Sequence, residues 1–321
     1  MEADVRAIAM TATTLPARTN RRGASVWAAL SRACIMGAAA ILFVASPAIA
    51  QKKVERKLPL GMEGAIRIVN MVGTVVVHGW NKDTVMVRGT LGPGDNFFMG
   101  GGYTGAKMFV EAANERDPKP ARLEVWVPAR VRLWVKTATA NIDVSGVDGG
   151  LDLYVVSGTI DVTGNPHELN AEAIDGDIHI TGSPPWVRAK SASGTIVFQG
   201  ASADAAFSTV SGAVKVGGGI FERAKIETVT GNINFSGLLD RSGSFDFDTH
   251  SGTIDIAIPD KTPASFSVVT IAGAITNNLS RNSPIPGRFG RGAELTMDAS
   301  GGGAKVSVRT FKGPVTLRRA K

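Results

Sequence analysis

The polar residues with the greatest potential for chemistry are Asp143, Asp161, Asp177 and His179, which fall in consecutive copies of one short motif. Paired carboxylates can supply the acid and the nucleophile of glycoside hydrolysis, and an Asp–His pair can ligate a metal ion. On neighbouring β-strands Asp143 and Asp161 would be about 5 Å apart, which is close to the separation in retaining glycosidases. Those enzymes, however, hold their carboxylates on opposite sides of a cleft. We therefore predict a solvated polar face with no catalytic, cofactor-binding or metal-binding residues.

Hydroxyl and imidazole side chains form the other chemical candidates. One set of hydroxyl residues occupies the same position, directly before the first glycine, in five copies of the motif: Ser157, Ser193, Ser211, Thr230 and Ser251. We call such a set of equivalent positions a column. Serine and threonine bond nearby backbone in turns, so we expect these residues at corners of the chain. The four histidines are His78, His167, His179 and His250. They occupy different columns of the repeat, and none is expected to pair with both an acid and a nucleophile.

The motif that carries these residues repeats with a period close to 18 residues. Its clearest copies are SGTIDVTG (Ser157–Gly164), DGDIHITG (Asp175–Gly182), SGTIVFQG (Ser193–Gly200), SGAVKVGG (Ser211–Gly218), TGNINFSG (Thr230–Gly237) and SGTIDIAI (Ser251–Ile258). The spacings between their first glycines are 18, 18, 18, 19 and 21 residues. An earlier copy, TANIDVSG (Thr139–Gly146), has Ala140 in place of that glycine. A fixed period of this length is typical of a solenoid, in which each unit stacks on the next.

Each repeat contains two stretches in which apolar and polar residues alternate. After the first glycine of one copy, Ile178 and Ile180 flank the polar His179. Before it, Leu169 and Ala171 flank a polar residue in the same way. This alternation predicts β-strands with one buried face. We therefore predict an all-β fold, a flattened right-handed parallel β-solenoid with two strands per rung of ~18 residues and about ten rungs in all.

The pattern extends outward and predicts a single solenoid domain over residues 51–321. Its expected parts are an opening rung at 58–79, inserted strands and a Gly-rich loop at 80–128, regular rungs at 129–277, and a loop with closing strands at 278–321. Copies are expected to stack in sequence order, and Val306–Leu317 is the last rung. The inserted strands are expected at Thr84–Gly89, Lys107–Glu111 and Arg122–Val127, with the Gly-rich loop at Gly92–Gly105.

Aromatic residues near this insertion have two interpretations that the sequence leaves open. Phe97, Phe98, Met99 and Tyr103 form either the core of an end cap or a contact patch for a partner. Trp126 and Trp134 either pack at the solenoid entrance or stack on a sugar. Both interpretations are physically reasonable, because long loops often carry function and aromatic rings serve cores and interfaces alike.

The first 50 residues resemble an export signal. Arg21, Arg22 and Arg32 precede the apolar run Ile35–Val44, and Ala48-Ile49-Ala50 offers a cleavage site. An uncleaved N-terminal anchor is the alternative. Residues 1–50 hold the single cysteine, five of the 35 basic and two of the 28 acidic residues, so residues 51–321 carry 30 − 26 = +4 charges. This mildly basic, dispersed charge argues against nucleic-acid binding.

The repeat resembles the DUF4097 group of bacterial extracytoplasmic proteins, which are often labelled adhesins and placed among toast-rack β-solenoids. The likeness is carried by the GxIxVxG copies and by the segments Gly61–Trp80, Leu123–Gly146 and Gly301–Arg319. It spans about residues 58–319. The resemblance implies a place in the cell envelope and supplies no catalytic residues to transfer.

We therefore predict an exported, non-catalytic protein of the periplasm, the outer-membrane surface or the medium. It would serve the cell envelope as a structural, adhesive or ligand-presenting module, because repeated rungs present long faces suited to multivalent contact. Its expected partner is an envelope component, a glycan or a protein, with self-association through the solenoid ends as a further route. The alternative is a periplasmic carbohydrate-active enzyme of the β-helix type, which would need a concave site with converging polar groups.

Overall fold

The computed structural model describes residues 51–288 and 290–320, so the predicted export signal lies outside the described residues. These residues belong to a compact unit bounded by Ile49–Lys321. Their regular structure is entirely β, in strands β1 to β22, which confirms the all-β prediction. Within the same residues no helix is long and apolar enough to cross a bilayer.

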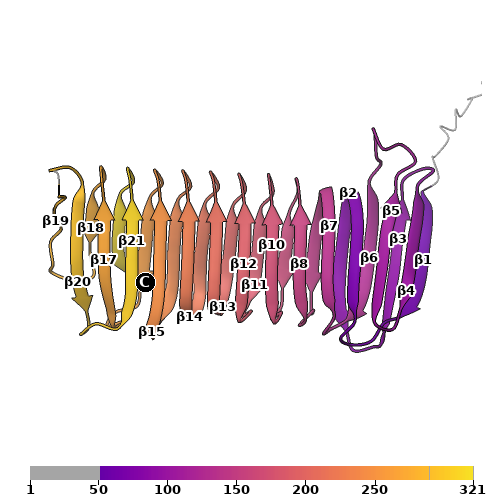
Figure 1. Cartoon of the computed structure of the whole chain (residues 1–321), viewed down its shortest axis with the longest axis horizontal. Helices are drawn as coiled ribbons and strands as arrows, with labels where there is room; N and C mark the ends of the chain where they lie inside the picture. Colours follow the sequence, from indigo (N-terminus) through magenta and orange to yellow (C-terminus); the bar gives the residue numbers. More distant parts are fainter. Residues whose placement is uncertain (1–50, 289, 321) are drawn as a thin grey trace, which may run out of the picture. The chain divides into compact units, whose positions relative to one another are not determined.

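Strands from successive repeats pair in parallel and in register. Before the corner glycine, β8 (Gly150–Val155), β10 (Glu168–Ala173) and β12 (Trp186–Ser191) align Leu151 with Leu169 and Leu169 with Val187. After it, β9 (Ile160–Thr163), β11 (Ile178–Gly182) and β13 (Ile196–Thr209) align Ile160, Ile178 and Ile196. We call these two sets the leading ladder and the trailing ladder. Identical repeat positions therefore lie side by side, as Figure 1 shows for the row of strands.

Several strands continue through a corner from one ladder into the other. They are β7 (Arg132–Ser145), β13, β14 (Val214–Thr228) and β15 (Ile233–Thr249), followed by the short β16 (Ile254–Ile258). Their alternation places the apolar set inside: in β13, Phe198 is 0% and Phe207 is 1% exposed. Phenylalanines dominate the middle of the core, where Phe235 and Phe247 have ring centroids 5.2 Å apart. Each fully buried side chain of this size contributes about 1.5–3 kcal/mol of transfer free energy, which explains a stable core without disulfides.

Buried hydroxyls cap the corners, and they occupy a column that sequence analysis did not single out. The column lies three residues before the glycine and contains Ser191, Thr209, Thr228, Thr249, Thr270 and Thr310, all buried. Ser191 Oγ accepts a hydrogen bond from Gly194 N at 3.0 Å and donates to Gly176 O at 2.9 Å. The expected column one residue before the glycine also lies at corners, but Ser193 is exposed and donates to Asp175 Oδ1 at 2.8 Å. The buried column is therefore the one whose hydroxyls form hydrogen bonds with the backbone N–H and C=O groups of the corners.

At the N-terminal end, antiparallel strands close the stack. β2 (Ala65–Trp80) pairs in parallel with β7 on one side and with β5 (Gly105–Glu111) and β6 (Ala121–Pro128) on the other. β4 (Asn96–Gly102) pairs with β5, β3 (Thr84–Leu91) pairs with β6, and β1 (Lys52–Pro59) pairs with the outer edge of β3, all antiparallel. The three predicted inserted strands are confirmed. The Gly-rich loop prediction was wrong in part, because β4 occupies it. The charged β1 blunts the edge, since charged side chains oppose pairing with another chain.

At the C-terminal end, the predicted stacking in sequence order is wrong. β21 (Ala304–Thr310) and β22 (Val315–Arg319) insert between β15–β16 and the rung of β17 (Ala264–Thr270) and β18 (Ile275–Asn277). Val315 therefore pairs with both Ile254 and Ile275. Figure 1 accordingly shows the C-terminus beside β15, inside the row. The reason is that β20 (Ala293–Ala299), backed by β19 (Ile285–Pro286), covers the other edge of β17.

Ile178→Asp tests the inward alternation, because it places an unpaired charge in the core. We expect the free energy of unfolding to fall by about 3–5 kcal/mol, measured by urea denaturation. His179→Asn, one residue further along the same strand, should change it by less than about 1 kcal/mol. Equal effects of the two substitutions would contradict the inward and outward assignment.

Thr249→Val tests the corner hydroxyls. Thr249 Oγ1 accepts hydrogen bonds from Gly252 N at 3.1 Å and from Thr228 Oγ1 at 2.8 Å. The substitution keeps the side-chain shape but leaves a buried N–H without its acceptor, so we expect a loss of about 1–3 kcal/mol. Thermal unfolding beside the exposed control Thr276→Val measures the difference, and an unchanged midpoint for Thr249→Val would refute the capping role.

Candidate functional site

The sequence-predicted polar group is only partly assembled. Asp143 and Asp161 are partners on neighbouring strands, as expected. His179 Nδ1 lies 2.9 Å from Asp161 Oδ1, and their side chains are 45% and 47% exposed respectively. Asp177 instead turns to a corner, where its Oδ1 accepts a hydrogen bond from Thr195 N at 2.7 Å. In the described part of the chain, no group of three or more His, Cys, Asp or Glu residues could hold a metal ion.

A serine, a histidine and a glutamate meet on the outer surface of the trailing ladder, contrary to the prediction that no histidine has both partners. His78 Nδ1 lies 3.0 Å from Ser145 Oγ, and His78 Nε2 lies 3.4 Å from Glu124 Oε1. His78 and Ser145 share one repeat column, so a column comparison could have found this pair. Glu124 comes from β6, outside the period, and only the fold brings it near.

This trio has the residue types of a hydrolase but not its geometry. Ser145 Oγ also lies 3.4 Å from Val77 O, an acceptor that competes with the imidazole for the hydroxyl proton. The His78 and Glu124 side chains are 35% and 47% exposed, so water screens their interaction. A serine nucleophile also needs fixed donors aimed at the developing oxyanion. The arrangement is that of a solvated polar row packed against Trp126, whose ring centroid is 5.6 Å from that of His78.

The outer surface of the leading ladder carries a more distinctive arrangement, which we call the cation–aromatic patch. It comprises Arg67, Lys107, Phe109, Trp134, Lys136 and Tyr154, on strands β2, β5, β7 and β8. In each of three pairs a cation lies over an aromatic ring: Arg67 over Trp134 at 4.7 Å, Lys107 over Phe109 at 5.3 Å and Lys136 over Tyr154 at 5.4 Å. The register of β2 with its two neighbours brings the patch together, because Arg67 is aligned with Lys107 on β5 and with Trp134 on β7.

The positive charge of the patch is largely uncompensated. Among the described residues, Arg67, Lys107 and Lys136 have no carboxylate within ion-pair distance, whereas Arg132 lies 3.5 Å from Asp152. Farther along the same outer surface most cations have a carboxylate partner: Arg188 and Arg223 both contact Asp204, at 2.7 and 3.1 Å. There, too, the pKa of Lys225 is raised by its hydrogen bond with Glu227. The unpaired cations thus concentrate at the N-terminal end of the leading ladder.

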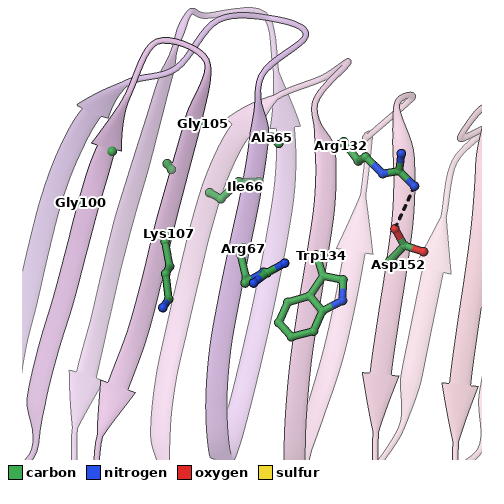
Figure 2. Close-up of a pocket in the computed structure, with 11 residues that line it drawn as sticks. Ala65, Ile66, Arg67, Gly100, Gly105, Lys107, Arg132, Trp134 and Asp152 are labelled. Atoms are coloured by element: carbon green, nitrogen blue, oxygen red, sulfur yellow. Dashed lines mark hydrogen bonds and ion pairs between the residues drawn. The ribbon is translucent and has the colours of Figure 1, made fainter.

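A shallow hollow of about 500 Å³ lies beside these cations (Figure 2). Small residues create it, because Ala65, Gly100 and Gly105 stand where larger side chains would fill the surface. Figure 2 shows Arg67 extending toward Trp134 across β2 and β7, with Lys107 on the opposite side of Arg67. The hollow is open and flat, so it can accept part of an extended molecule lying along the surface.

The aromatic residues divide between the two interpretations left open by the sequence. Phe97 and Met99 pack against the core, while Phe98 and Tyr103 are 45% and 59% exposed. Phe98 stacks on Phe109 with ring centroids 4.9 Å apart and so extends the aromatic surface of the patch. Trp126 packs beside Trp80, at 6.5 Å between ring centroids, whereas Trp134 belongs to the patch.

The parallel ladders and corner glycines define the class as an all-β repeat protein with a solenoid-like arrangement of strands. The Toastrack DUF4097 family model matches residues 151–318, more than half of the chain, and the chain belongs to this family. No match to a curated protein was found.

Three solved structures show distant similarity. A candidate cell adhesion protein from Clostridium sporogenes aligns with 84% of this chain and 100% of its own, at 9% identity and a TM-score of 0.28. A candidate adhesin from Bacteroides fragilis covers 85% and 99%, at 10% identity and 0.29. A candidate lipid-binding protein from Parabacteroides distasonis covers 84% and 97%, at 10% identity and 0.34. These scores are too low to inform the site.

Labelling with a fluorophosphonate probe tests whether Ser145 is activated. Because its hydroxyl has a competing backbone acceptor and its histidine is exposed to water, we expect no more label than in the Ser145→Ala variant. Mass spectrometry of the labelled chain measures this. Label at Ser145 that disappears in His78→Ala would reveal a working nucleophile and contradict the non-catalytic assignment.

Proposed function

We propose that this protein is a non-catalytic, adhesin-like module that binds acidic glycans through the cation–aromatic patch. One observation carries the proposal: three cations lie over three aromatic rings on adjacent strands, and none of the three has a carboxylate partner among the described residues. Membership of the Toastrack family supports a binding role.

The chemistry of the patch matches the chemistry of an acidic polysaccharide. Sugar rings present C–H faces that pack on aromatic side chains, and half-buried Trp134 and Tyr154 offer such surfaces. Uronate or sulfate groups would pair with Arg67, Lys107 and Lys136, whose exposed ends already gather at one place. Strands about 4.8 Å apart repeat these contacts along the surface, which favours a polymer over a single small sugar.

The proposal includes a finer architecture and a location. We infer one domain over residues 51–321, formed by a right-handed, flattened solenoid of about ten rungs, since parallel crossovers are overwhelmingly right-handed. The in-register parallel pairs support this coil. Residues 1–50 would serve as an export signal, which places the protein outside the cytoplasm in the periplasm, at the outer surface or in the medium. An envelope glycan would then be within reach.

The carbohydrate-active enzyme remains the second candidate, and its geometry is less favourable. Asp143 and Asp161 lie side by side on one open surface instead of facing each other across a bound sugar. Asp161 already contacts His179, and both side chains are nearly half exposed. Such groups lack the desolvation that separates an acid from a nucleophile in glycosidases.

Binding to polygalacturonate, an acidic polysaccharide, tests the proposal, with neutral dextran as the comparison ligand. The double variant Arg67→Ala/Lys107→Ala should weaken polygalacturonate binding by about tenfold or more, because two charge-assisted contacts with the carboxylates of the polymer are lost. Isothermal titration at two salt concentrations measures both the affinity and its electrostatic part.

The matched control is Arg223→Ala/Arg309→Ala, which removes the same charge from exposed positions on the leading ladder. These arginines already pair with Asp204 and Asp248, so their loss should change affinity by less than about twofold. Equal weakening by both double variants would indicate attraction to overall charge and would overturn the patch as the binding site. Equal binding of dextran would overturn the acidic-glycan assignment.

A further inference from the structure

A second hollow, of about 430 Å³, lies at the corner of β2 and shares only Phe109 with the cation–aromatic patch. We call it the corner pocket. Its lining combines apolar side chains with acids: Met71, Phe109, Val110, Asp95, Glu111 and Glu115 are the members that matter here. Pockets with largely apolar walls and a few polar groups are typical of small-molecule sites.

Asp95 is the unusual member of this lining. It is only 2% exposed, and its Oδ1 accepts a hydrogen bond from Ala113 N at 2.9 Å. Its Oδ2 is buried and has no hydrogen-bond partner among the described residues. Lys52 Nζ approaches Asp95 but bonds to its backbone oxygen, at 3.4 Å, and not to the carboxylate. A buried carboxylate oxygen without a donor is costly, so its retention calls for a partner.

Gly92 shows where the free oxygen lies. A Cβ added to Gly92 would stand 2.6 Å from Asp95 Oδ2 and 2.5 Å from Lys119 Cβ, so both atoms border the same small space. Lys119 also lines the corner pocket. Its ammonium is turned away from Asp95 to pair with Asp117. Glycine at position 92 thus allows the backbone to pack directly against Asp95 Oδ2 and Lys119, where any larger residue would collide with both.

We propose that the corner pocket binds a protonated amine carried on an apolar stem. Asp95 would receive the ammonium, while Glu111 and Glu115 supply further negative charge at the rim. Met71, Phe109 and Val110 would cover the stem, and a cation next to an aromatic ring gains additional attraction. The same chemistry occurs in free alkylamines and in the lysine side chain of a polypeptide. This site shares Phe109 with the proposed glycan surface, but none of its charged residues belongs to that surface.

Titration of the full chain with hexylammonium, monitored by isothermal calorimetry, tests the corner pocket. We expect saturable binding of hexylammonium and none of hexanoate, which has the same stem and the opposite charge. Asp95→Asn, nearly the same in shape, should weaken hexylammonium binding by about tenfold or more because the charged hydrogen bond is lost. A blocked Gly-Gly-Lys-Gly-Gly peptide distinguishes the sources: tighter binding of the peptide identifies a polypeptide lysine, and tighter binding of hexylammonium identifies a free amine.

Glu63→Gln is the matched control, since the Glu63 side chain is 82% exposed and lies outside the pocket lining. It should leave hexylammonium affinity unchanged. If Asp95→Asn does not fold, Glu115→Gln at the exposed rim serves instead and should weaken binding by about threefold. Absence of saturable hexylammonium binding overturns the proposal, as does equal affinity in the control and in the Asp95 or Glu115 variant. Neither result bears on polygalacturonate binding, which depends on the charged residues Arg67 and Lys107 outside the pocket lining.

Discussion

The close approach of backbone at the corners is the constraint on which the structure depends. Gly176, Gly194 and Gly212 each stand where an added Cβ would collide with the carbonyl oxygen of the preceding corner. The same contact continues at Gly231, Gly252, Gly313 and Gly273. Because this contact sets how one rung lies on the next, it also sets the register of every side-chain row. Inward rows form the core, and outward rows form the surfaces available for binding.

Register turns a repetitive sequence into local chemistry. Arg67, Lys107 and Trp134 are far apart in sequence, but alignment of β5, β2 and β7 makes them neighbours. The Ser145–His78–Glu124 row forms in the same way on the other ladder. What distinguishes the two surfaces is the pairing of their charged groups: Glu124 contacts His78 in the second row, whereas the three cations of the patch have no carboxylate partner among the described residues. A similar contrast separates the patch from the corner pocket, where an acid is the group without a partner.

The regular part of the fold was predictable, because each repeat carries its own alternation and corner glycine. The parallel strands from Leu151 to Ile256 follow from that pattern, whereas local sequence outside the period indicated the three inserted strands. The ends were not predictable in the same way. Identical inward residues let any rung stack on any other, so the alternation of Val306 and Val308 could not reveal that β21 inserts beside β15. The strand β4 escaped notice because its glycines suggested a loop.

The site was less predictable than the fold. The spacing of the repeat correctly predicted that Asp143, Asp161 and His179 lie on one face of the ladder. It did not predict that the Asp177 side chain turns away from that row to accept a hydrogen bond at a corner. Arg67 and Lys107 lie in or beside the irregular segments, where the period gives no alignment, so their meeting depends on pairing through β2. The corner pocket depends on the turn that carries Asp95 and on the segment that follows β5, for which the repeat offers no information.

Disulfide formation between engineered cysteines tests most directly whether corner contacts, and not sequence order, determine the stacking. In a Cys34→Ser background, the outward residues Thr276 and Thr316 are direct neighbours, whereas Asp255 and Thr276 are separated by the inserted strand. The account predicts rapid oxidation of the Thr276→Cys/Thr316→Cys pair and none of the Asp255→Cys/Thr276→Cys pair, because two strand spacings exceed the reach of a disulfide. Rapid oxidation of the second pair with an unreactive first pair would contradict it.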